Sequence, residues 1–292
     1  MSDSVAESYA YCRVLAKRTA RNFYYSFLTL PRSRLQAMCV LYAFMRVTDD
    51  LGDNDRPEAL RAGDLKHWQE SLVKAVSTGH SDHPVLPALV DVVRGYGIPV
   101  QYLLDVIAGV EMDLRPVAYE TFERLSDYCY HVAGAVGLAC IHMWGFHDDR
   151  APQAAIDCGT AFQLTNILRD LREDAGQGRV YLPAEDLAKF QMTPSDLAEG
   201  CRDDRFQGLM QFEVARAREY YARARPLYDF LDPPGKPILE TMLRIYGGLL
   251  DEIERRGYDV FTRRIELSSW RKFCMAAHTA ARHKMHRLFF RP

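Results

Sequence analysis

The sequence lacks the long apolar stretches and regular cysteine motifs that mark several classes of protein. It contains no run of 18 or more apolar residues, which predicts that no helix crosses a membrane. Its first residues do not combine a basic segment with an apolar one, so we expect no signal peptide. The seven cysteines are scattered without a Cys-x-x-Cys pair. This pattern suggests neither a zinc site nor a disulfide framework, and it favours a cytoplasmic protein.

The chain also lacks a strong excess of charge, internal repeats and long linkers. Its net charge of -2 argues against a general nucleic-acid-binding protein. With 292 residues and 48% hydrophobic content it can build a sizeable core, and we expect one domain over residues 1–292. No Gly-x-Gly-x-x-Gly motif stands at a strand–helix turn, so the sequence leaves the use of NADPH open. The oligomeric state is equally open.

Helical periodicity runs through most of the chain. Pro31 suits the first turn of a long helix that ends near residue 51. The same pattern recurs over residues 58–77, 84–95, 99–114, 119–145, 150–174, 204–231, 236–256 and 269–288. Strand-like alternation is short, so the predicted fold class is all-α. The least regular stretch, 175–202, is predicted to be a loop, either a lid over a bound ligand or an ordinary connector.

Two Asp-x-x-x-Asp pairs each end a long, mostly apolar helical stretch. They are Asp49 with Asp53, and Asp170 with Asp174. Residues four apart share a face of a helix, so each pair sets two like charges side by side at a cost of roughly 0.2–0.5 kcal/mol. A hard cation with a diphosphate ligand turns this repulsion into binding, since Mg²⁺ takes one or two carboxylates plus substrate phosphates. The alternative is a solvated helix face.

Further polar side chains extend each acidic pair along the same face of its helix. Tyr42 and Arg46 precede Asp49 by seven and three positions, and Gln163 and Asn166 precede Asp170 by seven and four. A polar stripe on an apolar helix predicts a cavity with a polar ligand, because a dry core would leave these groups unpaired. Arginines beside the pairs suit a diphosphate, namely Arg46, Arg169 and Arg172. Two surface helices with intrahelical Arg–Asp pairs are the alternative.

These segments resemble the two signatures of the squalene/phytoene synthase family. The first is Leu-Tyr-Ala-Phe-Met-Arg-Val-Thr-Asp-Asp at 41–50, and the second is Gln-Leu-Thr-Asn-Ile-Leu-Arg-Asp-Leu-Arg-Glu-Asp at 163–174, followed by Gly-Arg-Val-Tyr-Leu-Pro at 178–183. Other matches are Phe23-Tyr24, Leu-Pro-Arg at 30–32, the stretch from Tyr130 to Gly137, and Tyr246 with Arg263. The resemblance covers roughly residues 10–275. It implies a single-domain isoprenoid synthase fold with helices around a central cavity.

The resemblance also implies a reaction and a set of site residues. The reaction is head-to-head coupling of two farnesyl or geranylgeranyl diphosphates through a cyclopropylcarbinyl diphosphate, with Mg²⁺ or alternatively Mn²⁺. Alternatives are a branch member that stops at presqualene diphosphate or makes hydroxysqualene, and a non-catalytic assembly or lipid-binding relative. The expected metal ligands are Asp49, Asp53, Asp170 and Asp174. The expected catalytic residues are Tyr42, Arg46, Tyr130, Gln163, Asn166, Arg169, Tyr181, Tyr246 and Arg263.

The walls of the cavity must be apolar or aromatic, because a carbocation is captured by nucleophiles. Candidates for binding the prenyl tails are Phe23, Phe27, Cys39, Val136 and Gly137, although residues at such spacing equally form plain core. The small residues from Ala133 to Ala139 either keep a channel open or allow close helix packing. His131, in the same segment, is expected to be a hydrogen-bonded structural residue.

Two further features bear on substrate choice and location. Family members commonly carry serines where this chain has Ala20, Arg21 and Asn22, which leaves substrate and product choice open. The C-terminal tail at about 263–292 has eight Lys/Arg against the single acid Glu266, with Leu288, Phe289 and Phe290 near its end. Such a segment either touches anionic lipid at the inner face of the membrane or is a solvated helix face.

Overall fold

The computed structural model describes residues 3–115 and 118–289, without the side chains of residues 3, 21, 22 and 284–289. The expectations for the side chains of Arg21, Asn22, Leu288 and Phe289, and for Phe290, therefore lie outside the described residues. Within the described ranges, regular structure is helical, with two isolated bridges at Ala118–Val180 and Phe146–Leu231. The predicted all-α class is confirmed. No described helix is both long and apolar enough to cross a bilayer.

The helices follow one another along the chain with short connections at most joints. In order they are α1 (Asp3–Thr19), α2 (Arg21–Phe27), α3 (Arg32–Gly52), α4 (Glu58–Thr78), α5 (Leu86–Tyr96), α6 (Val100–Met112), α7 (Phe122–Cys129), the π-helical turn η1 (Tyr130–Gly134), α8 (Ala135–Trp144), α9 (Ala151–Gly176), α10 (Ala184–Lys189), α11 (Pro194–Glu199), α12 (Asp204–Ala224), α13 (Leu227–Phe230), α14 (Lys236–Arg255) and α15 (Ser269–Phe289).

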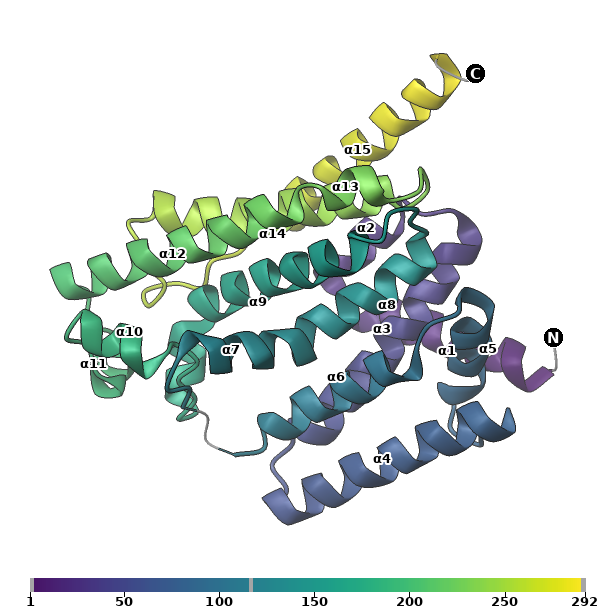
Figure 1. Cartoon of the computed structure of the whole chain (residues 1–292), viewed down its shortest axis with the longest axis horizontal. Coiled ribbons are helices and arrows are strands. Elements are labelled where there is room, and N and C mark those ends of the chain that lie inside the picture. The colour runs from purple at the N-terminus through teal and green to yellow at the C-terminus, as the bar shows by residue number, and fades with distance from the viewer. Residues whose placement is uncertain (1–2, 116–117, 290–292) are drawn as a thin grey trace.

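The long helices pack side by side around α9. Helix α9 contacts α12, η1, α8 and α14, while α3 contacts α1, α4, α5 and α6 (Figure 1). Helix α4 forms one edge of the molecule, and α15 packs on α14 and α2 before its last turns extend beyond the other helices (Figure 1). This arrangement leaves α3, α6, α8, α9 and α14 facing one another across the middle.

The two helices with acidic pairs form where the sequence predicts them. Pro31 precedes the first residue of α3, a position where its missing N–H costs nothing, and α3 ends at Gly52. Helix α9 has 26 residues and is about 39 Å long. The carboxyl-terminal ends of both helices, with the acidic pairs, come to the same end of the molecule, where Arg179 pairs with Asp53 and lies close to Asp174.

The predicted helix ranges differ from the structure in three places. Neither α1 nor α2 was among the predicted ranges. The predicted helix over 204–231 is two helices, because Pro226 interrupts the hydrogen-bonding pattern between α12 and α13. The predicted helix over 119–145 contains η1, whose five-residue turn changes the rotation of the side chains that follow it. The stretch 175–202 is irregular as predicted, apart from the short helices α10 and α11.

Small residues allow close packing between η1–α8 and α9. A Cβ atom on Gly159 would lie 2.5 Å from the carbonyl oxygen of Ala133, and one on Gly137 would lie 2.8 Å from that of Ala155. Ala133 and Gly137 also line the central cavity. The small-residue series therefore serves both of the purposes considered from the sequence.

Candidate active site

The helices enclose a cavity of about 380 Å³ that is apolar along most of its length. On α9 its lining runs from Ala155 to Asn166, about 16 Å along the helix axis. One end carries Asp49, Asp113 and Asn166. The far end is closed by large apolar side chains, namely Trp144, Leu227 and Leu239. Such a shape suits a ligand with a polar head and a long apolar tail.

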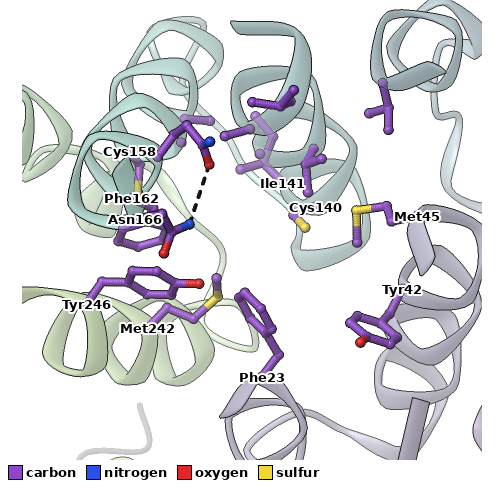
Figure 2. Close-up of a pocket in the computed structure, with 18 of the residues that line it drawn as sticks. Phe23, Tyr42, Met45, Cys140, Ile141, Cys158, Phe162, Asn166, Met242 and Tyr246 are labelled. Carbon is purple, nitrogen blue, oxygen red and sulfur yellow. Dashed lines mark hydrogen bonds between the residues drawn. The ribbon is translucent and has the colours of Figure 1, made fainter. Parts of the chain in front are cut away.

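Aromatic rings form the wall next to the polar end. Phe162 and Tyr246 stack with ring centroids 4.4 Å apart and planes 19° apart, and Phe23 lies 5.8 Å from Tyr246 (Figure 2). Tyr42 is on the other side of Phe23 at 6.5 Å, and it also contacts Phe27 at 6.2 Å. Ring faces attract cations and offer them no reactive lone pair, so this wall suits a carbocation.

The first acidic pair is electrostatically strained. Burial raises the pKa of Asp49 to about 7, with the carboxylates of Asp50, Asp53 and Asp113 adding to the rise and Arg46 opposing it. Arg46 forms an ion pair with Asp50, with 3.2 Å between Nε and Oδ2. Asp53 is exposed and meets the guanidinium of Arg179 at 3.5 Å. A bound cation would relieve the repulsion among these carboxylates.

The second acidic pair behaves in the same way. Burial raises the pKa of Asp174 to about 7, and the neighbouring Asp170 and Asp113 add to the rise while Arg179 opposes it. Asp170 is paired with Arg169, with 2.9 Å between Nε and Oδ1, and with Arg264 at 3.4 Å. Both motifs thus combine carboxylates of raised pKa with arginines that balance part of the charge.

Asp113 joins the two motifs, and the sequence did not single it out. It stands just after α6, and its carboxylate accepts hydrogen bonds from the hydroxyls of Tyr128 and Tyr181, each 2.8 Å long. Burial raises the pKa of Asp113, against these hydrogen bonds and Arg179. The sequence did contain a signal for Asp113, because it follows an apolar helical stretch in the same way as the acidic pairs follow theirs. Arg179, also not predicted as a site residue, lies among Asp53, Asp113 and Asp174.

The donor set fits magnesium. The side-chain oxygen of Asn166 is buried without a hydrogen-bond partner, while its Nδ2 donates to Oε1 of Gln163 at 3.4 Å (Figure 2). An unpaired buried oxygen is costly unless a ligand meets it. Within the part of the chain that the structure describes, no three His, Cys, Asp or Glu side chains converge tightly enough to hold an ion alone. Each ion would therefore need substrate oxygens as well, as is usual for Mg²⁺.

A second, more polar cavity adjoins the first. It shares Phe23, Asn166 and Tyr246 with the apolar cavity. Its other lining includes four cationic side chains and one acid, namely Lys17, Arg169, Arg264, Lys272 and Glu266. We call this cavity the basic recess. Lys272 is almost fully buried there, and burial lowers its pKa while Glu266 opposes the shift. A cluster of cations that includes a buried lysine suits an anion with several oxygens.

Most residues predicted from the sequence come together at these two cavities. Those that line the apolar cavity are Phe23, Phe27, Tyr42, Arg46, Asp49, Val136, Gly137, Gln163, Asn166 and Tyr246. Those gathered by direct contacts or charge at its acidic end are Asp53, Arg169, Asp170, Asp174 and Tyr181.

Other predicted residues lie elsewhere. Tyr130 points to α6, where its hydroxyl donates to Asp105 at 2.8 Å, and Tyr128 lines the cavity instead. Cys39 is buried near Cys12 of α1, where burial raises its pKa to about 11, and the neighbouring Met38 lines the cavity. Both placements follow from the rotation of the helices that carry these residues.

The basic residues near the second motif also differ from the prediction. Arg263 is exposed and takes part in a hydrogen bond through its carbonyl oxygen, whereas the adjacent Arg264 reaches Asp170. Arg172 donates to the carbonyl oxygen of Phe261 and so anchors the segment before α15. His131 has its Nδ1 2.9 Å from the carbonyl oxygen of Asp127, so it is hydrogen-bonded as expected.

Comparison with known proteins places this architecture in a family. A sequence model described as squalene/phytoene synthase matches residues 16–271. The phytoene synthase of Arthrospira platensis is 39% identical, with 91% of this chain and 90% of the relative covered. The 15-cis-phytoene synthase of Synechococcus elongatus is 38% identical, with 93% of this chain and 92% of the relative covered. The chain belongs to the squalene/phytoene synthase family.

Solved structures of squalene/phytoene synthases share the fold. A dehydrosqualene synthase in complex with a ligand superimposes with a TM-score of 0.87 at 27% identity, covering 96% of this chain and 98% of that one. The squalene synthase HpnC of Alicyclobacillus acidocaldarius gives a TM-score of 0.82 at 28% identity, covering 88% of this chain and 97% of that one. The family and the fold predicted from the two acidic motifs are confirmed.

Proposed function

We propose that this protein is a Mg²⁺-dependent prenyltransferase that joins two geranylgeranyl diphosphates head to head. The reaction passes through a cyclopropylcarbinyl diphosphate to a phytoene-type hydrocarbon. The observation that carries the proposal is an aromatic-walled apolar cavity that has Asp49 and Asp113 at one end, beside the second acidic pair, and that adjoins the basic recess. The choice of geranylgeranyl over farnesyl diphosphate is supported by relatives named phytoene synthase at 38–39% identity.

The acidic end would hold the metal ions. Asp49 and Asp53 would bind on one side, and Asn166, Asp170 and Asp174 on the other. When bound, Mg²⁺ neutralises the charge that develops on a departing diphosphate, which is a Lewis-acid role. Burial and neighbouring carboxylates raise the pKa values of Asp49 and Asp174 in the metal-free protein, and a cation bound next to them would favour their ionised forms.

The chain's own cations and rings perform the remaining tasks. Arg169, Arg264 and Lys272 would hold a diphosphate in the basic recess by charge-assisted hydrogen bonds. Phe162 and Tyr246 would cover the carbocation and exclude water from it. The hydroxyls of Tyr128 and Tyr181 fix the orientation of Asp113 between the two motifs. Arg179 and Tyr181 belong to the segment after α9, which supports its role as a lid.

Incubation of the purified protein with Mg²⁺ and either geranylgeranyl or farnesyl diphosphate tests the proposal. We expect a C40 hydrocarbon from geranylgeranyl diphosphate, without a requirement for NADPH, and loss of product in EDTA. Mn²⁺ in place of Mg²⁺ tests the alternative ion. Accumulation of presqualene diphosphate or hydroxysqualene from farnesyl diphosphate would instead support the branch alternatives. Absence of turnover with both substrates would support the non-catalytic alternative.

We also propose that the protein is cytoplasmic and makes peripheral contact with a membrane. The substrates are amphiphilic, and the product is a hydrocarbon that water cannot dissolve. Cell fractionation tests this location: the protein is expected partly in the membrane fraction and is expected to leave it at high salt, because electrostatic attraction to anionic lipid is screened.

A further inference from the structure

Large apolar side chains are exposed together where α2 meets α15. Trp270 is 73% exposed and stacks on Phe273 with centroids 5.8 Å apart, and Phe273 is itself 44% exposed. Phe273 meets the ring of the half-buried Tyr25 edge-on, with centroids 6.3 Å apart, and Leu28, just after α2, is 51% exposed. We call these four residues, Tyr25, Leu28, Trp270 and Phe273, the α2–α15 face. Contiguous exposed apolar groups usually mark a surface that binds something.

The charges around the α2–α15 face are mainly positive. Lys17, Arg18 and Arg271 are exposed, and in the described part of the chain no carboxylate lies within ion-pair distance of their side chains. Arg264 is also at this edge, but it is paired, with Glu173 at 3.2 Å, Asp170 at 3.4 Å and Glu266 at 3.9 Å. Aromatic and leucine side chains beside the exposed cations Lys17, Arg18 and Arg271 are the composition that binds an anionic lipid surface.

A second copy of the chain fits this face less well. In a two-fold dimer each surface meets itself, so the cations around one face would lie against the same cations of the other. Like charges brought together across an interface oppose association. Anionic headgroups have the complementary charge, and the acyl region beneath them accepts the aromatic side chains.

The α2–α15 face also borders the route into the reaction site. Tyr25 and Leu28 line the mouth of the basic recess, which shares Phe23, Asn166 and Tyr246 with the apolar cavity. A lipid surface at this face would therefore lie next to the entrance for an amphiphilic molecule. Helix α4, which carries the exposed Leu60, is at the opposite edge of the molecule (Figure 1).

We propose that the α2–α15 face docks on an anionic bilayer, with Trp270 and Phe273 inserted among the headgroups and the mouth of the basic recess at the lipid surface. This inference rests on the proposed membrane contact and names the surface that makes it. It does not depend on which prenyl diphosphate is coupled. Its test therefore measures lipid binding without turnover.

Tryptophan fluorescence reports on this contact directly. Of the three tryptophans, Trp68 and Trp144 are each 4% exposed and Trp270 is 73% exposed, so a change in solvent contact on docking falls on Trp270. Adding vesicles of phosphatidylcholine and phosphatidylglycerol to the full-length protein should shift its emission to shorter wavelength, and bromine-labelled acyl chains should quench the shifted emission. Vesicles of phosphatidylcholine alone should have much less effect. The variant Trp270→Phe should lose the shift.

Vesicle co-sedimentation separates the face from general adhesion. The double variant Trp270→Ser/Phe273→Ser should bind the anionic vesicles about tenfold more weakly or worse, since it removes two inserted aromatic side chains. Arg271→Glu should weaken binding without removing any apolar surface. Leu60→Ser, which removes an equally exposed apolar residue on α4, should bind like the unaltered protein. Circular dichroism and melting temperature show whether each variant is folded.

Each other outcome overturns the proposal. If the unaltered protein does not bind anionic vesicles, both the membrane contact and this surface are wrong. If it binds but the double variant and Arg271→Glu bind equally well, contact is made elsewhere. If the unaltered protein is a dimer by sedimentation and the double variant is a monomer, the α2–α15 face is a self-association surface. Turnover of geranylgeranyl diphosphate in detergent tests the proposed reaction separately.

Discussion

Replacing Asp49 by asparagine should stabilise the metal-free protein while it removes most of the activity. Burial and three neighbouring carboxylates raise the pKa of Asp49 from 3.8 to about 7. The difference of about 3 pKa units corresponds to at most about 4 kcal/mol of unfavourable ionisation in the folded state. Because solvent reaches the Asp49 side chain at the cavity mouth, screening reduces this value, and we expect about 1–2 kcal/mol.

The sign of the effect determines its pH dependence. The folded-state pKa is raised, so the unfolded chain loses its proton at lower pH than the folded protein does. The contribution of Asp49 to stability therefore falls as pH rises from about 4 to about 7 and is constant above that range. Asparagine does not ionise, so the advantage of Asp49→Asn should be small near pH 4 and reach its full value near pH 8.

Urea denaturation in EDTA at several pH values measures this difference, with turnover in saturating Mg²⁺ assayed in parallel. The variant should lose more than about 100-fold in kcat, because a proposed metal ligand is missing. The matched control is Asp55→Asn, an exposed turn residue close by, which should change stability by less than about 0.5 kcal/mol and retain full turnover. A destabilised Asp49→Asn, or an advantage that does not vary with pH, would refute the reasoning about charge at this site.

Three further predictions follow from other positions. Gly159→Ala should lower the free energy of unfolding by about 1–3 kcal/mol, because its Cβ would lie 2.5 Å from a backbone oxygen of η1, whereas Gly63→Ala on exposed α4 should raise it by about 0.5–1 kcal/mol. Equal urea midpoints for the two variants would contradict this packing. Arg264→Gln should reduce kcat/KM about tenfold or more, whereas Arg263→Gln should change it little. The reverse result would show that Arg263 is the site residue. Trp144→Leu should extend the far end of the cavity and raise the ratio of kcat/KM for a C25 diphosphate over that for a C20 diphosphate about tenfold. A constant ratio would mean that other residues close the far end of the cavity.

The part of the site that the sequence predicted is the part set by helical periodicity. Positions three and four apart share a helix face whatever the rest of the fold does. The stripes from Tyr42 to Asp53 and from Gln163 to Asp174 could therefore be assigned to one cavity before its walls were known. The all-α class follows for the same reason, since long stretches of one period leave little room for strands.

The errors occur where the backbone leaves that period or where the partner is distant in sequence. The π-helical turn adds a residue per turn, so the side of the helix that faces the cavity carries Tyr128 and not Tyr130. Arg263 and Arg264 stand in a non-helical segment, where spacing does not say which side chain turns inward. Asp113 has no acid three or four positions before it on α6, and it becomes a site residue because Tyr128 and Tyr181 arrive from other segments.

The arginines at the acidic end explain how the protein tolerates so much like charge before substrate binds. The carboxyl-terminal end of a helix is already electronegative, so Asp53 and Asp174 stand where anions are least favoured. Arg179 meets Asp53 at 3.5 Å and Arg264 meets Asp170 at 3.4 Å, which offsets part of the cost. In the proposed reaction these guanidinium groups would exchange a carboxylate oxygen for a diphosphate oxygen, a partner of greater charge that suits the guanidinium fork. The repulsion in the free protein is then relieved only when metal and diphosphate are both present, which couples the binding of the two.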